Sequence, residues 1–254
     1  MMTPKEFYNK CYKYLLQIKP KEITDLDKYF IGENINCKTL NEIFKCLTAS
    51  ARNYQSAPNV IQYEKRKKEI DEILYDYDFN KILKNYDYDK LFICFKIRFN
   101  IATKDSPNNT WRRWSKSIID SAKFISNFKN ISEFNEFVNC FVHNVFTRVA
   151  LPMLIDKEIS GIGFALACDF IKELGYVEYC KPDVHIIEVL NHFDSVIYDQ
   201  YGAFKRFIEI ALEADVTSYK LDKIVWLICS GNFYKDDIKI GSHKTELIKI
   251  LNEC

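Results

Sequence analysis

The chain has 254 residues, almost balanced charge with 36 Lys and Arg against 35 Asp and Glu, and only 7 glycines and 6 prolines. So little Gly and Pro favours long helices over turn-rich β-structure, and the length is enough to bury a sizeable core. We therefore expect an all-α protein. Because the net charge is only +1, a polyanionic partner would have to meet a local basic patch.

The cysteines and the apolar runs indicate the cellular compartment of the protein. Nine cysteines are scattered without Cys-X-X-Cys or Cys/His ligand spacing. Several stand in helical, apolar settings, which predicts buried reduced thiols and a reducing compartment: Cys46, Cys94, Cys140, Cys168 and Cys229. Lysines interrupt the first helix, and no apolar run is long enough to cross a bilayer. We expect a cytoplasmic protein that does not contact membranes.

Two capping boxes open the early helices. Thr3 and Glu6 flank Pro4, and Thr39 with Glu42 repeats the pattern before a second apolar stripe. That second helix runs into a polar stretch of small residues, 48–58, which ends at a proline.

The middle of the chain alternates charged and aromatic stretches. Residues 64–90 are typical of a solvated helix face, and we interpret 91–99 as a helix rather than a strand. From Lys96 to Lys123, seven basic residues stand against two acidic ones, which indicates a patch that could face phosphates. Trp111 and Trp114 share a helical stripe with apolar residues, which favours the core over base stacking.

Residues 159–175 form a hairpin signature followed by a helix. Ser160-Gly161-Ile162-Gly163 precedes apolar residues at helical spacing, and Gly175 follows as a C-cap. The two hairpin glycines can adopt a conformation that other residues avoid and leave bare N–H groups at the helix start, an arrangement that attracts phosphate. Ordinary helix punctuation is the alternative interpretation.

An acidic residue opens the next helix. Pro182-Asp183-Val184-His185 precedes a stripe that contains Ile186 and Val189, with Pro182 at the start and Asp183 in the first turn. The helix dipole would keep that carboxylate ionised. The alternative role of Asp183 is a simple N-cap.

Together these segments resemble the signature of the helix-hairpin-helix DNA glycosylases of the endonuclease III superfamily. In that family a Gly-X-Gly hairpin and helix are followed, about twenty residues later, by an essential Asp, and here Asp183 lies 20 residues after Gly163. The resemblance covers 151–193 closely and the chain from about Leu40 more loosely. It implies two packed helical lobes with a cleft between them, in a single unit of residues 1–254 whose N-terminal helices, 1–90, could form a sub-lobe.

The resemblance also implies a base-excision-repair activity and roles for individual residues. The enzyme would flip a damaged or modified base out of double-stranded DNA and hydrolyse its N-glycosidic bond, with Asp183 catalytic. Gly161, Ile162, Gly163 and His185 would bind the DNA backbone. Arg52, Asn53 and Gln55 would form a wedge in the duplex, unless they are a solvated helix end.

Cofactor expectations follow from the same resemblance. The backbone carbonyls of Lys157, Ile159 and Ile162 match positions that hold a monovalent cation in the family. Only Cys229 and Cys254 follow Asp183, so we expect no iron–sulfur cluster at the C-terminal end. We expect a monomer.

One departure from the family pattern bears on mechanism. Ala165 stands where bifunctional members carry the lysine that forms a Schiff base, so we expect a monofunctional glycosylase. The alternatives are a non-catalytic DNA-binding protein, a lyase that uses another lysine such as Lys172 or Lys181, and a hydrolase of free nucleosides. The sequence resembles the alkylpurine-type members somewhat more, and action on modified foreign DNA is a further option.

Overall fold

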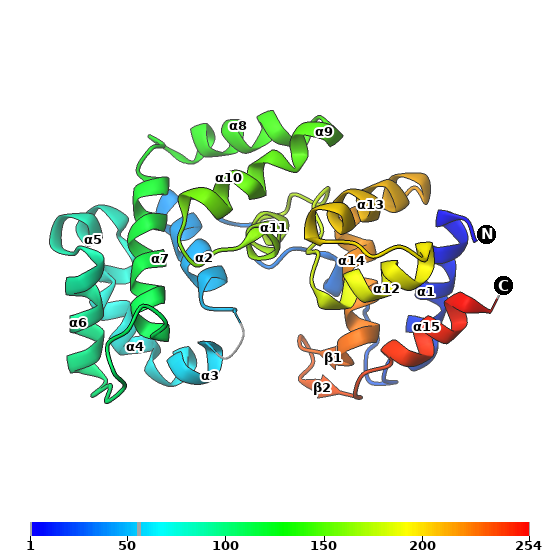
Figure 1. Ribbon diagram of the computed structural model, residues 1–254, viewed down its shortest axis with the longest axis horizontal. Helices are drawn as coiled ribbons and strands as arrows, with labels where there is room; N and C mark the ends of the chain where they lie inside the picture. Colours follow the sequence, from blue (N-terminus) through cyan, green and yellow to red (C-terminus); the bar gives the residue numbers. More distant parts are fainter. Residues whose placement is uncertain (1, 55–56, 254) are drawn as a thin grey trace. The chain divides into compact units, whose positions relative to one another are not determined.

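The computed structural model describes residues 2–54 and 57–253 of the chain, and the prediction of an all-α protein is confirmed (Figure 1). The chain divides into two compact units. Unit 1 comprises Met1–Ile35 and Ile171–Cys254, and unit 2 comprises Asn36–Phe170. The sub-lobe expected for 1–90 is therefore divided between the units, because the first helix packs with the C-terminal helices of unit 1.

Unit 2 is built around one long helix, α7. Its helices are α2 (Leu40–Ala51), α3 (Ala57–Ile61), α4 (Tyr63–Ile73), α5 (Phe79–Asn85), α6 (Tyr88–Arg98), α7 (Thr110–Ile125), α8 (Ile131–Val142), α9 (Val145–Arg148) and α10 (Ala150–Glu158), with a 3₁₀ turn at Tyr75–Tyr77. Helix α7 packs against α2, α5 and α6. Trp114 is fully buried, and its indole N–H donates to the Thr48 carbonyl at 3.1 Å. Both tryptophans of α7 thus belong to the core, as the stripe predicted.

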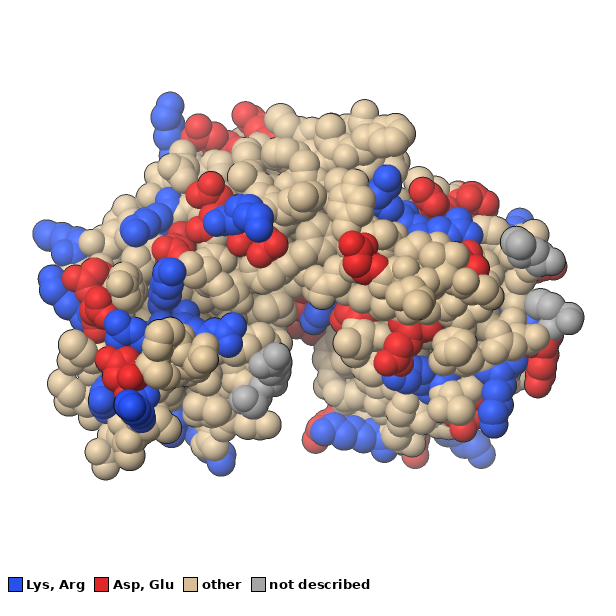
Figure 2. Space-filling model, in the orientation of Figure 1, with Lys and Arg blue, Asp and Glu red and all other residues tan. Residues whose placement is uncertain are grey.

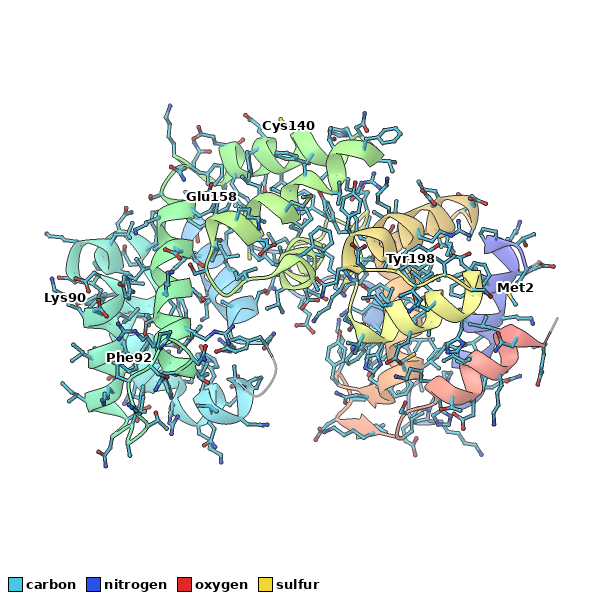
Figure 3. The ribbon with its side chains drawn as sticks, in the orientation of Figure 1. Met2, Lys90, Phe92, Cys140, Glu158 and Tyr198 are labelled. Atoms are coloured by element: carbon cyan, nitrogen blue, oxygen red, sulfur yellow. The ribbon has the colours of Figure 1, made fainter. Side chains whose placement is uncertain are left out.

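Figure 3 shows the two sides of α6, where the preference for a helix is confirmed. The ring of Phe92 is buried, whereas Lys90 projects from the outer surface. Within 64–90 the solvated face is interrupted at Tyr77, which is 1% exposed and donates a hydrogen bond to the Tyr63 hydroxyl at 3.1 Å. The charge pattern did not reveal this buried tyrosine, because its neighbours in sequence are polar.

Unit 1 is built around α14. Its elements are α1 (Pro4–Ile18), a 3₁₀ turn (Asp27–Phe30), α12 (Val184–Asp194), α13 (Gln200–Glu213), α14 (Ser218–Ser230), β1 (Asn232–Phe233), β2 (Ile238–Lys239) and α15 (Lys244–Asn252). Helix α14 packs against α1, α12, α13 and α15. The two short antiparallel strands, with Phe233 opposite Ile238, were not predicted, because two-residue strands carry no periodicity.

The helix caps predicted from the sequence are present in both units. Both capping boxes are present, at Thr3 with Glu6 and at Thr39 with Glu42. Gly175 follows α11 (Phe164–Glu173) with φ +101°. Helix α11 starts in unit 2 and ends in unit 1.

The cysteine prediction is confirmed only in part. Cys168 and Cys229 are buried, but Cys46 and Cys94 are half-buried and Cys140 is exposed on α8, away from that helix's buried face. Among the described residues no single helix is long and apolar enough to span a bilayer, and α8 with α9 and α10 meets the length and composition only as a pair bent by 120°.

Candidate functional site

The hairpin is a tight turn between α10, whose last residue Glu158 is labelled in Figure 3, and α11. The side chains of Ile159 and Ile162 are buried, at 0% and 1% exposure. The Ile162 N–H donates to the Ile159 carbonyl at 3.2 Å, which closes the turn. The buried side chains of Ile159 and Ile162 therefore anchor the turn, and the backbone of the residues between them lies near the surface.

Helix α7 anchors this turn through Ser160. The Ser117 hydroxyl donates to the Ser160 carbonyl, and the Ser160 N–H donates to Asp120 Oδ2 at 3.2 Å. Both backbone groups of one hairpin residue are thus fixed to the central helix of unit 2.

The two hairpin glycines differ. Gly161 has φ +85°, and a Cβ there would lie 2.6 Å from Ser117 Oγ, so the predicted special conformation is confirmed. For Gly163 that prediction is wrong, since its φ is not positive. Gly163 already follows the path of α11, because its carbonyl accepts the Ala167 N–H at 3.0 Å. A Cβ at Gly163 would meet no protein atom within 4 Å, so packing inside the protein does not require glycine there.

Asp183 is the N-cap of α12 rather than a residue of its first turn, and Pro182 precedes the cap. The Asp183 backbone is extended, with φ −86° and ψ 179°, so the helix begins at Val184, two residues after the predicted start at Pro182. Its Oδ1 accepts the N–H groups of His185 at 2.9 Å and Ile186 at 3.2 Å. Within 2–54 and 57–253, its Oδ2 has no hydrogen-bond partner. The half-buried carboxylate is thus held by one oxygen and open at the other.

A buried ion pair fixes the segment that leads to Asp183. Lys172 of α11 and Asp222 of α14 are 3% and 1% exposed, with Lys172 Nζ 3.0 Å and 3.1 Å from the two carboxylate oxygens. Asp222 Oδ2 also accepts the Lys181 N–H at 2.5 Å. The Lys181 carbonyl in turn accepts the Asp183 N–H at 2.8 Å. Asp222 therefore lies two hydrogen bonds from the Asp183 backbone.

Further buried charges surround this pair. Lys223 Nζ lies 2.8 Å from Glu173 Oε1, and the Tyr219 hydroxyl donates to Glu173 Oε2 at 3.1 Å. Burial raises the pKa of the Asp222 carboxyl, while the Lys172 charge opposes that rise. We did not predict this network. The sequence carried a signal for it, since the charged residues Asp222 and Lys223 interrupt the apolar pattern of α14. The structure shows that both are buried.

His185 follows Asp183 in the first turn of α12. It is half-buried, and within the described part of the chain its buried Nδ1 has no hydrogen-bond partner. The ring therefore keeps one buried nitrogen whose hydrogen-bonding capacity the described residues do not satisfy.

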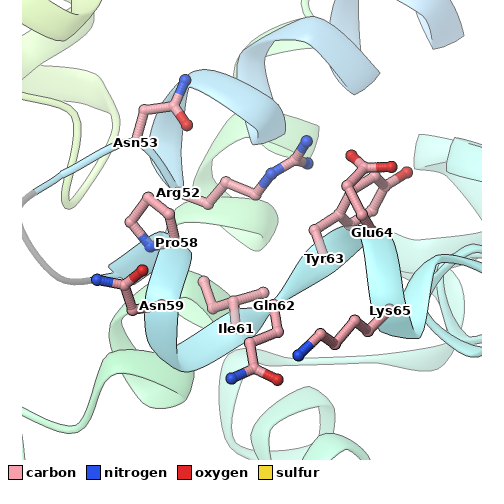
Figure 4. Close-up of a pocket in the computed structure, with 9 residues that line it drawn as sticks. All are labelled: Arg52, Asn53, Pro58, Asn59, Ile61, Gln62, Tyr63, Glu64 and Lys65. Atoms are coloured by element: carbon pink, nitrogen blue, oxygen red, sulfur yellow. The ribbon is translucent and has the colours of Figure 1, made fainter. Parts of the chain in front are cut away.

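The wedge candidates lie at the end of α2. Arg52 is the C-cap, and its guanidinium carbon lies 3.7 Å from the centre of the Tyr63 ring, whereas Asn53 is exposed. Gln55 lies outside the described residues. Arg52 and Asn53 line a pocket of about 480 Å³ in unit 2, together with Pro58, Asn59, Ile61, Gln62, Tyr63, Glu64 and Lys65 (Figure 4).

The possible cation ligands are backbone atoms of the hairpin. The Ile159 carbonyl accepts the Ile162 N–H and therefore keeps one lone pair for another partner. The Lys157 side chain is exposed in the last turn of α10. In the described residues, no group of three or more His, Cys, Asp and Glu side chains is placed to hold a metal ion.

No protein-family model matches the sequence, and no curated protein matches it. Among solved structures, the chain is similar to an 8-oxoguanine glycosylase/lyase of Methanocaldococcus jannaschii, crystallised with a 15mer DNA containing 8-oxoguanine. The similarity has a TM-score of 0.55 at 19% sequence identity and covers 87% of this chain and 95% of the other. The fold that the resemblance implied is thus confirmed: the chain has the same fold as this glycosylase/lyase.

Proposed function

We propose that this protein is a DNA glycosylase that flips a damaged or modified base and hydrolyses its N-glycosidic bond without cleaving the strand. One observation carries the proposal. In a chain with a glycosylase fold, the Asp that matches the family's essential carboxylate is fixed through Oδ1 and open at Oδ2.

The hairpin would hold the DNA backbone. The start of α11 bears the positive end of the helix dipole, and Gly163 exposes its backbone with no side chain in front of it. Such a contact positions a strand without reading its sequence. The protein's own packing does not require glycine at 163. The missing side chain would instead allow a phosphate to approach the backbone.

Asp183 would act on the sugar. Breaking the bond between base and sugar builds positive charge on the sugar, as in other reactions with an oxocarbenium-like transition state. A carboxylate stabilises that charge and can orient or deprotonate the attacking water. The two N–H groups on Oδ1 keep the side chain in one orientation, which leaves Oδ2 for this work.

Hydrolysis without strand cleavage is supported by the lysines near the site. Ala165 occupies the position of the family's nucleophilic lysine, and Lys172 is buried in its ion pair with Asp222. A glycosylase/lyase that uses Lys181 is the second candidate. Lys181 is half-buried two residues before Asp183, and the structurally similar archaeal protein is a glycosylase/lyase. Borohydride trapping of a covalent adduct that disappears in Lys181→Gln would select this candidate.

The remaining predicted contacts complete the proposal. His185, half-buried in the first turn of α12, would contact a phosphate next to the flipped nucleotide. Arg52 and Asn53 would fill the space that the base leaves in the duplex. A monovalent cation at the carbonyls of Lys157, Ile159 and Ile162 would connect the hairpin to a phosphate.

The test is base release from duplexes that carry oxidised, alkylated, deaminated or hypermodified bases, detected by mass spectrometry, with alkali cleavage of the abasic product. Asp183→Asn should reduce release by at least about 10²-fold. Because Asn caps helices as well as Asp does, folding and affinity for an abasic duplex should stay unchanged.

Asp199 provides the matched control. It is the N-cap of α13 and accepts the Gly202 N–H at 2.7 Å, so Asp199→Asn changes a cap without touching the proposed site. Full activity in Asp183→Asn, or an equal loss in both variants, would refute a catalytic Asp183. Salt-dependent binding without base release from any substrate would favour a non-catalytic DNA-binding protein.

A further inference from the structure

A second concave site lies in unit 2, on the same helix that anchors the hairpin. This α7 groove is lined by Tyr88, Pro107, Arg112, Arg113 and Lys116 and encloses about 330 Å³. Among the residues that the structure describes, three of the five lining side chains are cationic and none is acidic. Figure 2 shows Lys and Arg side chains gathered over the N-terminal half of α7, with acidic side chains among them.

The three cations have different surroundings. Arg112 is neutralised by Asp89 at 2.5 Å and by Asp105 at 2.9 Å. Among the described residues, neither Arg113 nor Lys116 forms an ion pair with a carboxylate. The Arg113 guanidinium packs 4.4 Å from the centre of the Tyr54 ring, which restricts its side chain. Arg113 and Lys116 are therefore the two cations of the groove that no carboxylate of the described residues pairs, and Arg113 is also held in place.

These two charges share a helix face with the hairpin anchors. Arg113, Lys116, Ser117 and Asp120 are spaced i, i+3, i+4 and i+7, which is one stripe of an α-helix. Ser117 and Asp120 hold Ser160, and Arg113 lies one turn from Ser117, about 6 Å along the axis. A single strand of DNA carries a phosphate for about every 3.4 Å of duplex axis. A strand held at the hairpin therefore brings further phosphates toward this stripe.

We propose that the α7 groove is a second phosphate site for the DNA backbone, so that unit 2 grips the strand at two points. The inference rests on the proposed function only in that DNA is the partner. Arg113 and Lys116 contact the phosphate, Arg112 fixes the wall of the groove through its two carboxylates, and Tyr88 and Pro107 pack against the sugar. The Asp120 carboxylate on the same stripe is occupied by the Ser160 N–H.

The experiment measures affinity for an unmodified duplex and for an abasic duplex over a series of KCl concentrations. Each phosphate contact contributes about 0.9 to the slope of log affinity against log salt, so Arg113→Gln/Lys116→Gln, which removes one phosphate contact, should flatten the slope by about 0.9. Lys116→Glu alone, at an exposed position, should weaken binding to both duplexes and cannot disturb the core.

Lys123→Gln/Lys129→Gln is the matched control. It removes two exposed cations from the same unit, from the end of α7 and from the segment that follows. An unchanged slope in the groove variant, or the same flattening in the control, would overturn the proposal. If the wild type binds DNA through these residues but releases no base, the groove stands and the glycosylase proposal fails. If release is intact and the slope does not move, only the groove fails.

Discussion

The hairpin of unit 2 and the Asp183 segment of unit 1 are both anchored to the central helix of their unit, but by different contacts. Each places polar groups at the start of a helix and fixes the preceding backbone to the central helix of its unit. In the hairpin, the Ser117 hydroxyl and the Asp120 carboxylate of α7 bind the backbone of Ser160. In the Asp183 segment, Asp222 of α14 pairs with Lys172 and accepts the Lys181 N–H.

The difference lies in what remains open. In the hairpin, the open element is the backbone at Gly163, which suits binding of a phosphate. In the Asp183 segment it is one carboxylate oxygen, which suits stabilisation of developing charge. A catalytic carboxylate needs a fixed orientation, and both residues that anchor the Asp183 segment, Lys172 and Asp222, are buried. In the hairpin anchor Ser117 is buried and Asp120 is half-buried.

The largest expected effect comes from breaking the buried anchor. Lys172→Met leaves the buried Asp222 carboxyl without its main partner, which should lower the free energy of unfolding by about 3–5 kcal/mol in urea titrations. The exposed pair of Arg98 and Glu72 is the control, and Glu72→Gln should cost at most about 1 kcal/mol.

The double variant Lys172→Met/Asp222→Leu separates stability from positioning. An apolar pair of similar volume should recover most of the lost stability. The leucine at 222 cannot accept the Lys181 N–H, so base release by the double variant should be lower than that of the wild type. Affinity for an abasic duplex should be retained. Recovery of both stability and base release would show that Asp222 has no positioning role.

The two hairpin glycines should separate folding from binding. Gly161→Ala should cost about 1–2 kcal/mol of stability from its left-handed backbone alone, before its contact with Ser117 is counted. Gly163→Ala should change stability by less than about 0.5 kcal/mol and still weaken DNA binding, because its methyl group would stand where the phosphate approaches. Equal binding by Gly163→Ala and wild type would contradict the hairpin's proposed role.

Local features of the sequence were sufficient to predict much of this fold. Capping boxes, apolar stripes and the C-cap glycine Gly175 depend on neighbours within a few residues, and the helices they predicted are present. Asp183 and Gly161 were found in the same way, because a cap and a tight turn leave short-range signals.

The anchors were missed because they depend on contacts between distant parts of the chain. Ser117 and Ser160 are 43 residues apart, and Lys172 and Asp222 are 50 apart, so no local spacing joins them. The different roles of Gly161 and Gly163 were also hidden, since the sequence shows two glycines and only the backbone shows which one is required for folding.

The smallest expected effect concerns the contact between α7 and the hairpin, and a double-mutant cycle can measure it. Ser117→Ala should cost about 1 kcal/mol or somewhat more, because the Ser160 carbonyl loses its donor. The same change removes the oxygen that a Cβ at 161 would meet at 2.6 Å. Ser117→Ala/Gly161→Ala should therefore be less destabilised than the sum of its single variants, by at least about 0.5 kcal/mol.

Ser117→Ala with Gly163→Ala serves as the reference cycle. A Cβ at 163 meets no protein atom within 4 Å, so these two changes should add within about 0.3–0.5 kcal/mol. Coupling confined to Gly161 would establish that the Ser117 side chain restricts position 161 and leaves position 163 unaffected. Equal coupling for both glycines would instead mean that Ser117 acts on the hairpin as a whole, and the contrast between a glycine that serves folding and a glycine that serves binding would then be lost.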